Sequence, residues 1–120
     1  MQVITKVLIA NRGEIAIRIA RAAQALGIHS ISIYAKEDEL SLHTRHTDQR
    51  IQLDQNTDPV AAYLNIDNVM QIAMDNSCDA IHPGYGFLSE NAELASACEA
   101  AGIIFVGPAA DTLKLFGNKV

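Results

Sequence analysis

Short runs of β-branched and aliphatic residues alternate along the chain with longer stretches whose apolar positions recur at helical spacing. The short runs have the length of strands, and the stretches have the period of amphipathic helices. Glycines and capping residues stand where these helices would begin or end. The pattern predicts strands over 7–10, 30–34, 50–53, 79–82 and 103–106. It predicts helices over 14–26, 66–76, between a Ser89 cap and Gly102, and over 109–116, with a short helical turn near Ser41.

Five strands that alternate with helices are typical of an α/β domain with a doubly wound, mostly parallel sheet of Rossmann-like type. Right-handed crossovers then place helices on both faces, and ligands bind beyond the carboxyl ends of the strands. Three segments rich in Gly, Pro or polar residues follow predicted strands, and we expect them along one edge of the sheet. These segments are Asn11–Arg12–Gly13, residues 82–86 and Gly107–Pro108.

The composition fits one packed domain over residues 1–120, with 49% hydrophobic and 19% charged residues. A formal net charge of −5 opposes nucleic-acid binding, which needs a basic surface. No apolar run has the length of a membrane span and no presequence pattern is visible, so we expect a cytoplasmic protein without membrane contact. Cys78 and Cys98 are interpreted as buried, reduced thiols, and no metal site is expected because further ligands are missing.

The turn after the first predicted strand carries Asn11, Arg12 and Gly13. A glycine permits a tight turn there, and the N-terminus of the following helix can attract an anion. Gly13 is the only glycine between Val7 and Leu26, so the dinucleotide-binding fingerprint with three spaced glycines is absent. Two interpretations of Arg12 stay open at this point, a structural salt bridge and a contact with a ligand.

The run HPGYGFLSEN at residues 82–91 is the most unusual stretch of the chain. Gly84 and Gly86 flank Tyr85, and such a loop brings backbone N–H groups close to a ligand without obstruction by side chains. His82, at the end of a predicted strand, is either a structural hydrogen-bonding residue or a group that titrates near neutral pH. The run therefore predicts a binding loop but no catalytic triad or carboxylate pair.

Charged residues on the first predicted helix and near residue 120 are further candidates. Glu14, Arg18 and Arg21 share one helix face, and Glu14 precedes Arg18 in the favourable orientation for an ion pair. This face is either solvated or a contact with another subunit or domain, where arginine is enriched. Lys119 is either an exposed lysine or a compact charge that reaches a phosphate.

Five runs of this sequence, in the same order, resemble the N-terminal domain of the biotin carboxylases. The resemblance covers essentially the whole chain, and the ten-residue loop at residues 82–91 is its most specific part. The matching runs are KVLIANRGEIAIR (6–18), YLNI (63–66), AIHPGYGFLSEN (80–91), IFVGP (104–108) and GNKV (117–120).

The resemblance implies a Rossmann-like lobe that precedes an ATP-grasp domain. Enzymes of this family use MgATP to activate bicarbonate through carboxyphosphate. They then carboxylate biotin on a carrier protein or domain, which serves a carboxyltransferase. Members with pyruvate, acetyl-CoA, propionyl-CoA or urea as carboxyl acceptor share this lobe.

The resemblance also assigns roles to individual residues. Lys119 matches the lysine that contacts the phosphates of ATP, although Asn118 stands where the family usually has Asp. Ala25 replaces an acidic residue of some dimer interfaces in the family. The biotin-side loop corresponds to His82, Gly84, Tyr85 and Gly86, and the homodimer contact corresponds to Arg18 and Arg21.

Two other classes of function are compatible with an α/β domain of this size. A stand-alone nucleotide-binding module is disfavoured because the glycine fingerprint is absent. A non-catalytic assembly module, such as a phospho-receiver, needs an acidic cluster at the strand ends, whereas the first predicted strand ends in Ala10 and Asn11.

In this family the magnesium-binding glutamates and the bicarbonate-binding residues are expected after residue 120, so no catalytic residue and no tightly bound cofactor is assigned within residues 1–120. We predict that residues 1–120 alone have no turnover, because phosphoryl transfer needs those groups for charge stabilisation. An ATPase assay with and without bicarbonate measures this. Bicarbonate-dependent hydrolysis above the buffer blank would contradict the prediction.

Overall fold

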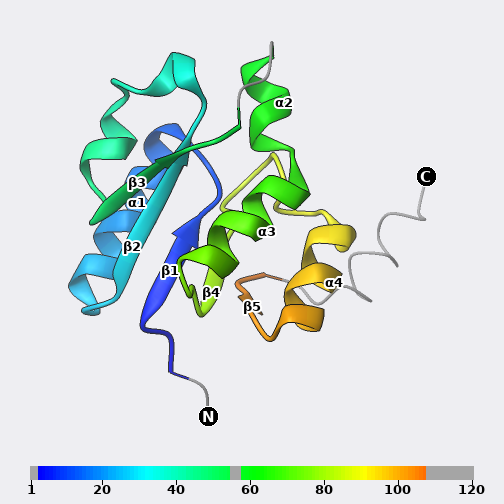
Figure 1. The fold of residues 1–120 in the computed structure, drawn as a ribbon. Coiled ribbons are helices and arrows are strands. Elements are labelled where there is room, and N and C mark those ends of the chain that lie inside the picture. The colour runs from blue at the N-terminus through cyan, green and yellow to red at the C-terminus, as the bar shows by residue number, and fades with distance from the viewer. Residues whose placement is uncertain (1–2, 55–57, 108–120) are drawn as a thin grey trace.

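The computed structural model describes residues 3–54 and 58–107. Five strands form one parallel sheet in the order β3-β2-β1-β4-β5 (Figure 1). The strands are β1 (Lys6–Ile9), β2 (His29–Tyr34), β3 (Gln49–Gln52), β4 (Ala80–His82) and β5 (Ile104–Phe105). The helices are α1 (Gly13–Ala25), α2 (Pro59–Tyr63), α3 (Ile66–Asp75) and α4 (Ala92–Ala101), with short 3₁₀ helices η1 (Lys36–Asp38) and η2 (Leu42–Arg45). The predicted doubly wound sheet is confirmed, and all five described strands are parallel.

The described helices cover the two faces of the sheet unevenly. Helix α1 lies on one face beside β1 and β2, and η2 packs next to it, whereas α3 and α4 lie on the other face (Figure 1). The chain first builds the sheet outward from β1 to β3 and then returns past β1 to add β4 and β5. Because crossovers are right-handed, this reversal moves the later helices to the opposite face.

Strand β1 is buried on both faces, which explains its continuous apolar sequence. Leu8 belongs to the large core cluster that includes residues of α3 and α4, whereas Ile9 packs with Ala16 and Ala20 of α1. The two side chains point to opposite faces because successive residues of a strand alternate. Each fully buried side chain of this size contributes about 1.5–3 kcal/mol to folding.

Helix α4 begins at a different cap from the one that the sequence pattern predicts. The prediction that Ser89 caps this helix is wrong: Asn91 is the N-cap, and its side-chain oxygen accepts a 2.9 Å hydrogen bond from Leu94 N–H. Ser89 lies in the preceding turn, where its backbone N–H donates to Gly86 O at 2.9 Å. The helix ends as predicted, since Gly102 follows it with a φ of 74° that favours glycine.

Helix α2 is absent from the prediction because five residues are too few to show helical periodicity. Its start signal is nonetheless present in the sequence, since Asp58 precedes Pro59 and its side chain accepts from Val60 N–H at 3.0 Å. The helical turn predicted near Ser41 is confirmed by η2. The helix predicted over 109–116 lies outside the described residues. Within residues 3–54 and 58–107, no helix is long and apolar enough to cross a membrane.

The cap of α4 is open to a direct test. We predict that Asn91→Ala lowers the free energy of unfolding by about 1 kcal/mol, because Leu94 N–H loses its acceptor. Ser89→Ala is the matched control and leaves the free energy of unfolding nearly unchanged. Chemical denaturation measures both variants, and an equal loss in the two would contradict this assignment of the cap.

Candidate functional site

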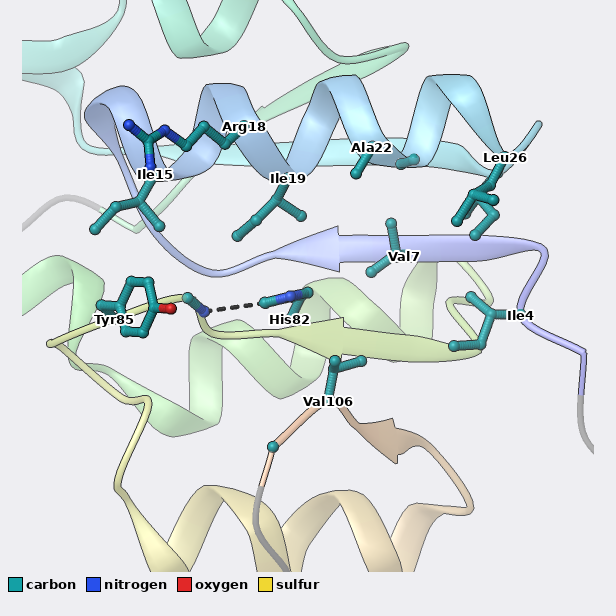
Figure 2. Close-up of a pocket in the computed structure, with 14 residues that line it drawn as sticks. Ile4, Val7, Ile15, Arg18, Ile19, Ala22, Leu26, His82, Tyr85 and Val106 are labelled. Carbon is teal, nitrogen blue, oxygen red and sulfur yellow. Dashed lines mark hydrogen bonds between the residues drawn. The ribbon is translucent and has the colours of Figure 1, made fainter.

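An open groove with a volume of about 680 Å³ runs along α1, on the same face of the sheet (Figure 2). Most of its lining is aliphatic, and its polar end lies where β1 and β4 terminate. Arg18, His82 and Tyr85 stand toward that end, while Ile4 and Leu26 stand toward the other (Figure 2). The remaining lining residues are Val7, Ile15, Ile19, Ala22, Ala23, Ile28, Gly84, Val106 and Gly107.

The groove brings together part of the predicted site. Gly107 lines it beside His82, Gly84 and Tyr85, as expected for segments that follow neighbouring parallel strands. Gly86 belongs to the same loop but does not line the groove. Pro108, Asn118 and Lys119 lie outside the described residues, so the predicted ATP-side lysine stays a prediction.

The loop after β4 has a backbone that requires its glycines. Gly84 and Gly86 have φ values of 67° and 68°, in the left-handed region where other residues are strained. His82 Nδ1 accepts a hydrogen bond from Gly84 N–H at 3.1 Å (Figure 2). Burial lowers the pKa of His82, which keeps the ring neutral and leaves the Nδ1 lone pair available to accept. Of the two interpretations of His82, the structure therefore confirms the structural hydrogen bond.

The same loop presents polar and aromatic groups that nothing else in the described chain uses. The side chain of Tyr85 is highly exposed, at 78%, although the residue lies between two tightly constrained glycines. Within residues 3–54 and 58–107, the backbone N–H groups of Tyr85, Gly86 and Phe87 have no hydrogen-bond acceptor. Donors without internal partners beside an exposed ring form a surface that can bind a polar, partly apolar ligand.

Asn11 connects the loop after β1 to the loop after β4. Its side chain is 1% exposed, and its amide nitrogen donates to the carbonyl oxygens of Pro83 and Tyr85, each at 2.7 Å. Its amide oxygen accepts from Arg12 N–H at 2.8 Å. The sequence analysis placed Asn11 in a turn but missed this role. A polar residue directly after a buried strand was the available signal, because a buried amide needs partners.

The open question about Arg12 is settled by a buried carboxylate. Arg12 Nη2 lies 2.7 Å from Asp38 Oδ1, so the interpretation as a structural salt bridge is confirmed. Tyr63, which is 1% exposed, donates its hydroxyl hydrogen to Asp38 Oδ2 at 2.7 Å and accepts from Ala35 N–H at 3.1 Å. The guanidinium also lies 5.9 Å from the centre of the Tyr63 ring. This network joins the turn after β1, η1 and α2.

The network also determines the protonation state of Asp38. Burial by itself raises the pKa of this carboxyl, but the hydrogen bonds from Tyr63 and Arg12 outweigh burial and hold the pKa below its ordinary value of 3.8. Burial and the adjacent carboxylate raise the pKa of the Tyr63 hydroxyl. Asp38 is therefore charged and Tyr63 neutral at physiological pH, which is the combination that this set of hydrogen bonds requires.

The predicted subunit-contact face of α1 is solvent-exposed in this structure. Arg18 and Arg21 are both exposed, and Arg18 Nε lies 3.5 Å from Glu14 Oε1. The predicted orientation of this ion pair is confirmed, but an exposed pair of this kind contributes little to stability. Both arginines therefore remain available for a contact with another chain.

The described residues contain no group of three or more His, Cys, Asp or Glu side chains that could hold a metal ion. Cys78 and Cys98 are buried, unpaired thiols, as predicted. Burial raises the pKa of each thiol to about 11, which makes both unreactive as nucleophiles.

Comparison with known protein families gives a match to the biotin carboxylase N-terminal domain over residues 3–113. The chain belongs to this family. The resemblance inferred from the sequence runs is confirmed, and so is the fold class, because solved structures of biotin carboxylase N-terminal domains superpose closely on this one.

Relatives of this biotin carboxylase N-terminal domain are much longer proteins. Pyruvate carboxylase of Bacillus subtilis is 50% identical over 119 residues, which is 99% of this chain but only 10% of that protein. The structure of Rhizobium etli pyruvate carboxylase matches 98% of this chain and 12% of that one, with a TM-score of 0.94 and 49% identity. The biotin carboxylase domain dimer of Hydrogenobacter thermophilus 2-oxoglutarate carboxylase, with MgADP and bicarbonate, matches 99% of this chain and 26% of that one, with a TM-score of 0.93 and 40% identity.

Tyr63→Phe tests the network around Asp38. We predict that the pKa of Asp38 rises, because the carboxylate loses one of the hydrogen bonds that favour its charged form. The lowered pKa of Asp38 in the folded state stabilises the fold above pH 3.8, and this stabilisation is lost as the pH falls through the folded-state pKa. Tyr63→Phe loses part of this stabilisation because the pKa of Asp38 moves back toward its ordinary value. At pH 7 the free energy of unfolding falls by about 1–2 kcal/mol.

NMR titration of the Asp38 carboxyl and denaturation at several pH values measure both effects. Tyr34→Phe is the control, because the Tyr34 hydroxyl has no hydrogen-bond partner in the described part of the chain. An unchanged titration of Asp38 in Tyr63→Phe would contradict the assigned hydrogen bond.

Proposed function

We propose that this chain is the N-terminal lobe of an ATP-dependent biotin carboxylase. As part of a longer protein, it would help to carboxylate biotin on a carrier protein or domain with MgATP and bicarbonate. The observation that carries the proposal is the loop at residues 82–86, whose exposed Tyr85 lines the polar end of the groove and whose N–H groups at Tyr85 and Gly86 have no acceptor among the described residues. Membership of the family supports the same function.

The chemistry of the loop suits the biotin ring system. Biotin carries a flat ureido ring with one carbonyl oxygen, so it needs hydrogen-bond donors for the oxygen and an apolar surface for the ring. The N–H groups of Tyr85, Gly86 and Phe87 are donors of this kind, and the Tyr85 ring offers the apolar surface. Because Gly84 and Gly86 lack side chains, a ligand can approach this backbone closely. We assign the biotin-binding side of the active site to His82, Gly84, Tyr85 and Gly86.

The ATP-binding side of the active site is assigned to Lys119, which would bind the nucleotide phosphates as a compact charge. When bound, MgATP supplies the phosphoryl group that activates bicarbonate. The resemblance to the family implies that the groups that bind Mg²⁺ belong to the rest of the longer enzyme. The chain spans about a tenth of its Bacillus subtilis relative, which leaves ample length for an ATP-grasp domain.

The proposed function also implies partners. The exposed arginines on α1, Arg18 and Arg21, are assigned to a homodimer contact, and a relative is described as a domain dimer. A biotin carboxyl carrier and a carboxyltransferase complete the reaction. Relatives named for pyruvate and for 2-oxoglutarate share this lobe, so the carboxyl acceptor is selected elsewhere in the enzyme. Two buried, unpaired thiols support a reducing location such as the cytoplasm.

We predict that Lys119→Ala in the full-length enzyme raises the KM for ATP about tenfold or more, because a charged hydrogen bond to phosphate is lost. The melting temperature changes little. Lys36→Ala, which removes an exposed lysine of the described chain, leaves the KM for ATP unchanged. Steady-state kinetics at varied ATP measure the effect, and unaltered KM and turnover in Lys119→Ala would rule out the assigned role.

A further inference from the structure

We propose that Asn11 is the positioning residue of the biotin-side loop, residues 82–86. Its side-chain amide sets the backbone conformation of the loop and therefore the direction in which Tyr85 and the free N–H groups face. The inference rests on the proposed role of this loop in binding biotin. Asn11 itself is buried, at 1% exposure.

The side-chain amide nitrogen of Asn11 has no free hydrogen-bond donor. Both Nδ2 hydrogens are used, one on Pro83 O and one on Tyr85 O, each at 2.7 Å. The oxygen accepts from Arg12 N–H at 2.8 Å. This arrangement determines the orientation of the amide, because a flipped side chain would set its oxygen against two carbonyl oxygens.

These contacts require an asparagine. Aspartate has the same shape, but its carboxylate has no hydrogen to donate and would face two carbonyl oxygens. Serine can donate to only one of the two carbonyls. Pro83 is buried, so a carbonyl that loses its donor there has no easy access to water.

The two hydrogen bonds hold the peptide group between Pro83 and Gly84 and the peptide group between Tyr85 and Gly86. Gly84 fits tightly in this position: a Cβ atom there would lie 2.7 Å from Asn11 Nδ2 and 2.7 Å from Ile15 Cγ2. Asn11 and Gly84 are therefore closely packed, and the loop after β4 lies directly against the turn after β1. Among the described residues, Asn11 is the only side chain from outside the loop that is hydrogen-bonded to it.

The direction of Tyr85 follows from this backbone. The ring is exposed and has no hydrogen bond of its own in the described chain, so its position depends on the peptide groups that carry it. One of those groups ends in the carbonyl that Asn11 binds. A loop held in its binding conformation avoids the cost of ordering when the ligand arrives, and small misplacements of a binding group lower reaction rates strongly.

The test uses the full-length enzyme with free biotin as the carboxyl-accepting substrate. Asn11→Asp and Asn11→Ser are compared with Asn65→Asp. Asn65 is a suitable control because its side chain only accepts a hydrogen bond, from Asn68 N–H at 3.1 Å, and a carboxylate caps a helix equally well. For each variant, kcat/KM for biotin and the KM for ATP are measured.

We expect kcat/KM for biotin to fall about tenfold or more in both Asn11 variants while the KM for ATP stays within about twofold. Asn65→Asp behaves as the unaltered enzyme. The proposal is overturned if kcat/KM for biotin is unchanged in both Asn11 variants, or if the KM for ATP rises by the same factor, which would indicate general damage to the fold.

Tyr85→Ala separates this inference from the proposed function. If kcat/KM for biotin falls in Tyr85→Ala but not in the Asn11 variants, the positioning role of Asn11 is excluded and the assignment of the loop to biotin stands. No loss in Tyr85→Ala removes the assignment of the loop to biotin, and the positioning role falls with it.

Discussion

The pairing of β1 with β4 is the constraint on which the rest of the structure depends. Ile9 lies opposite His82 in the register of the two strands, and the ladder continues one step further, since Ala10 N–H donates to His82 O at 2.9 Å. The two strands therefore end at the same edge of the sheet. The loops that follow β1 and β4 lie together at this edge, where α/β domains bind ligands.

The reversal in strand order explains why the groove exists. Helices α3 and α4 lie on the face opposite α1, so among the described residues α1 has no neighbouring helix on its own face beyond β1. Val7 and Val106 thus contribute to an open aliphatic surface (Figure 2). Parallel sheets normally have both faces covered. The part of this face that no described helix covers follows from the strand order. The chain spans about a tenth of the length of its Bacillus subtilis relative.

The sequence predicted what depends on local pattern and missed what depends on contacts between distant segments. Strands, the long helices and the glycine at the end of α4 followed from periodicity and from backbone preferences. The cap of α4 was misplaced because Ser89 and Asn91 both suit an N-cap, and only the turn after Gly86 decides between them. The pairing of Asp38 with Tyr63 joins residues 25 positions apart, and no local signal reports it.

The candidate site shows the same division. The loop at residues 82–86 was predictable because glycines on either side of a tyrosine have a local meaning, namely close approach to the backbone. The part that Asn11 plays was not predictable, because it needs the loop after β4 to lie within 2.7 Å of its amide. The residue types of the turn at Asn11–Arg12–Gly13 are typical of a ligand-binding segment, but in the folded chain Asn11 is hydrogen-bonded to the loop after β4.

Hydrogen-bonding capacity distinguishes a support from a binding element at this rim. Asn11 directs both hydrogens of its amide nitrogen inward, onto carbonyls of the neighbouring loop, so that nitrogen has no donor left for a ligand. Arg12 donates to Asp38. Tyr85 and the residues after it keep N–H groups that no described residue accepts from. Buried polar groups are satisfied internally, whereas groups that serve a ligand stay open until it binds. This criterion supports the proposal that the loop after β4 recognises the ligand and that the turn after β1 positions this loop.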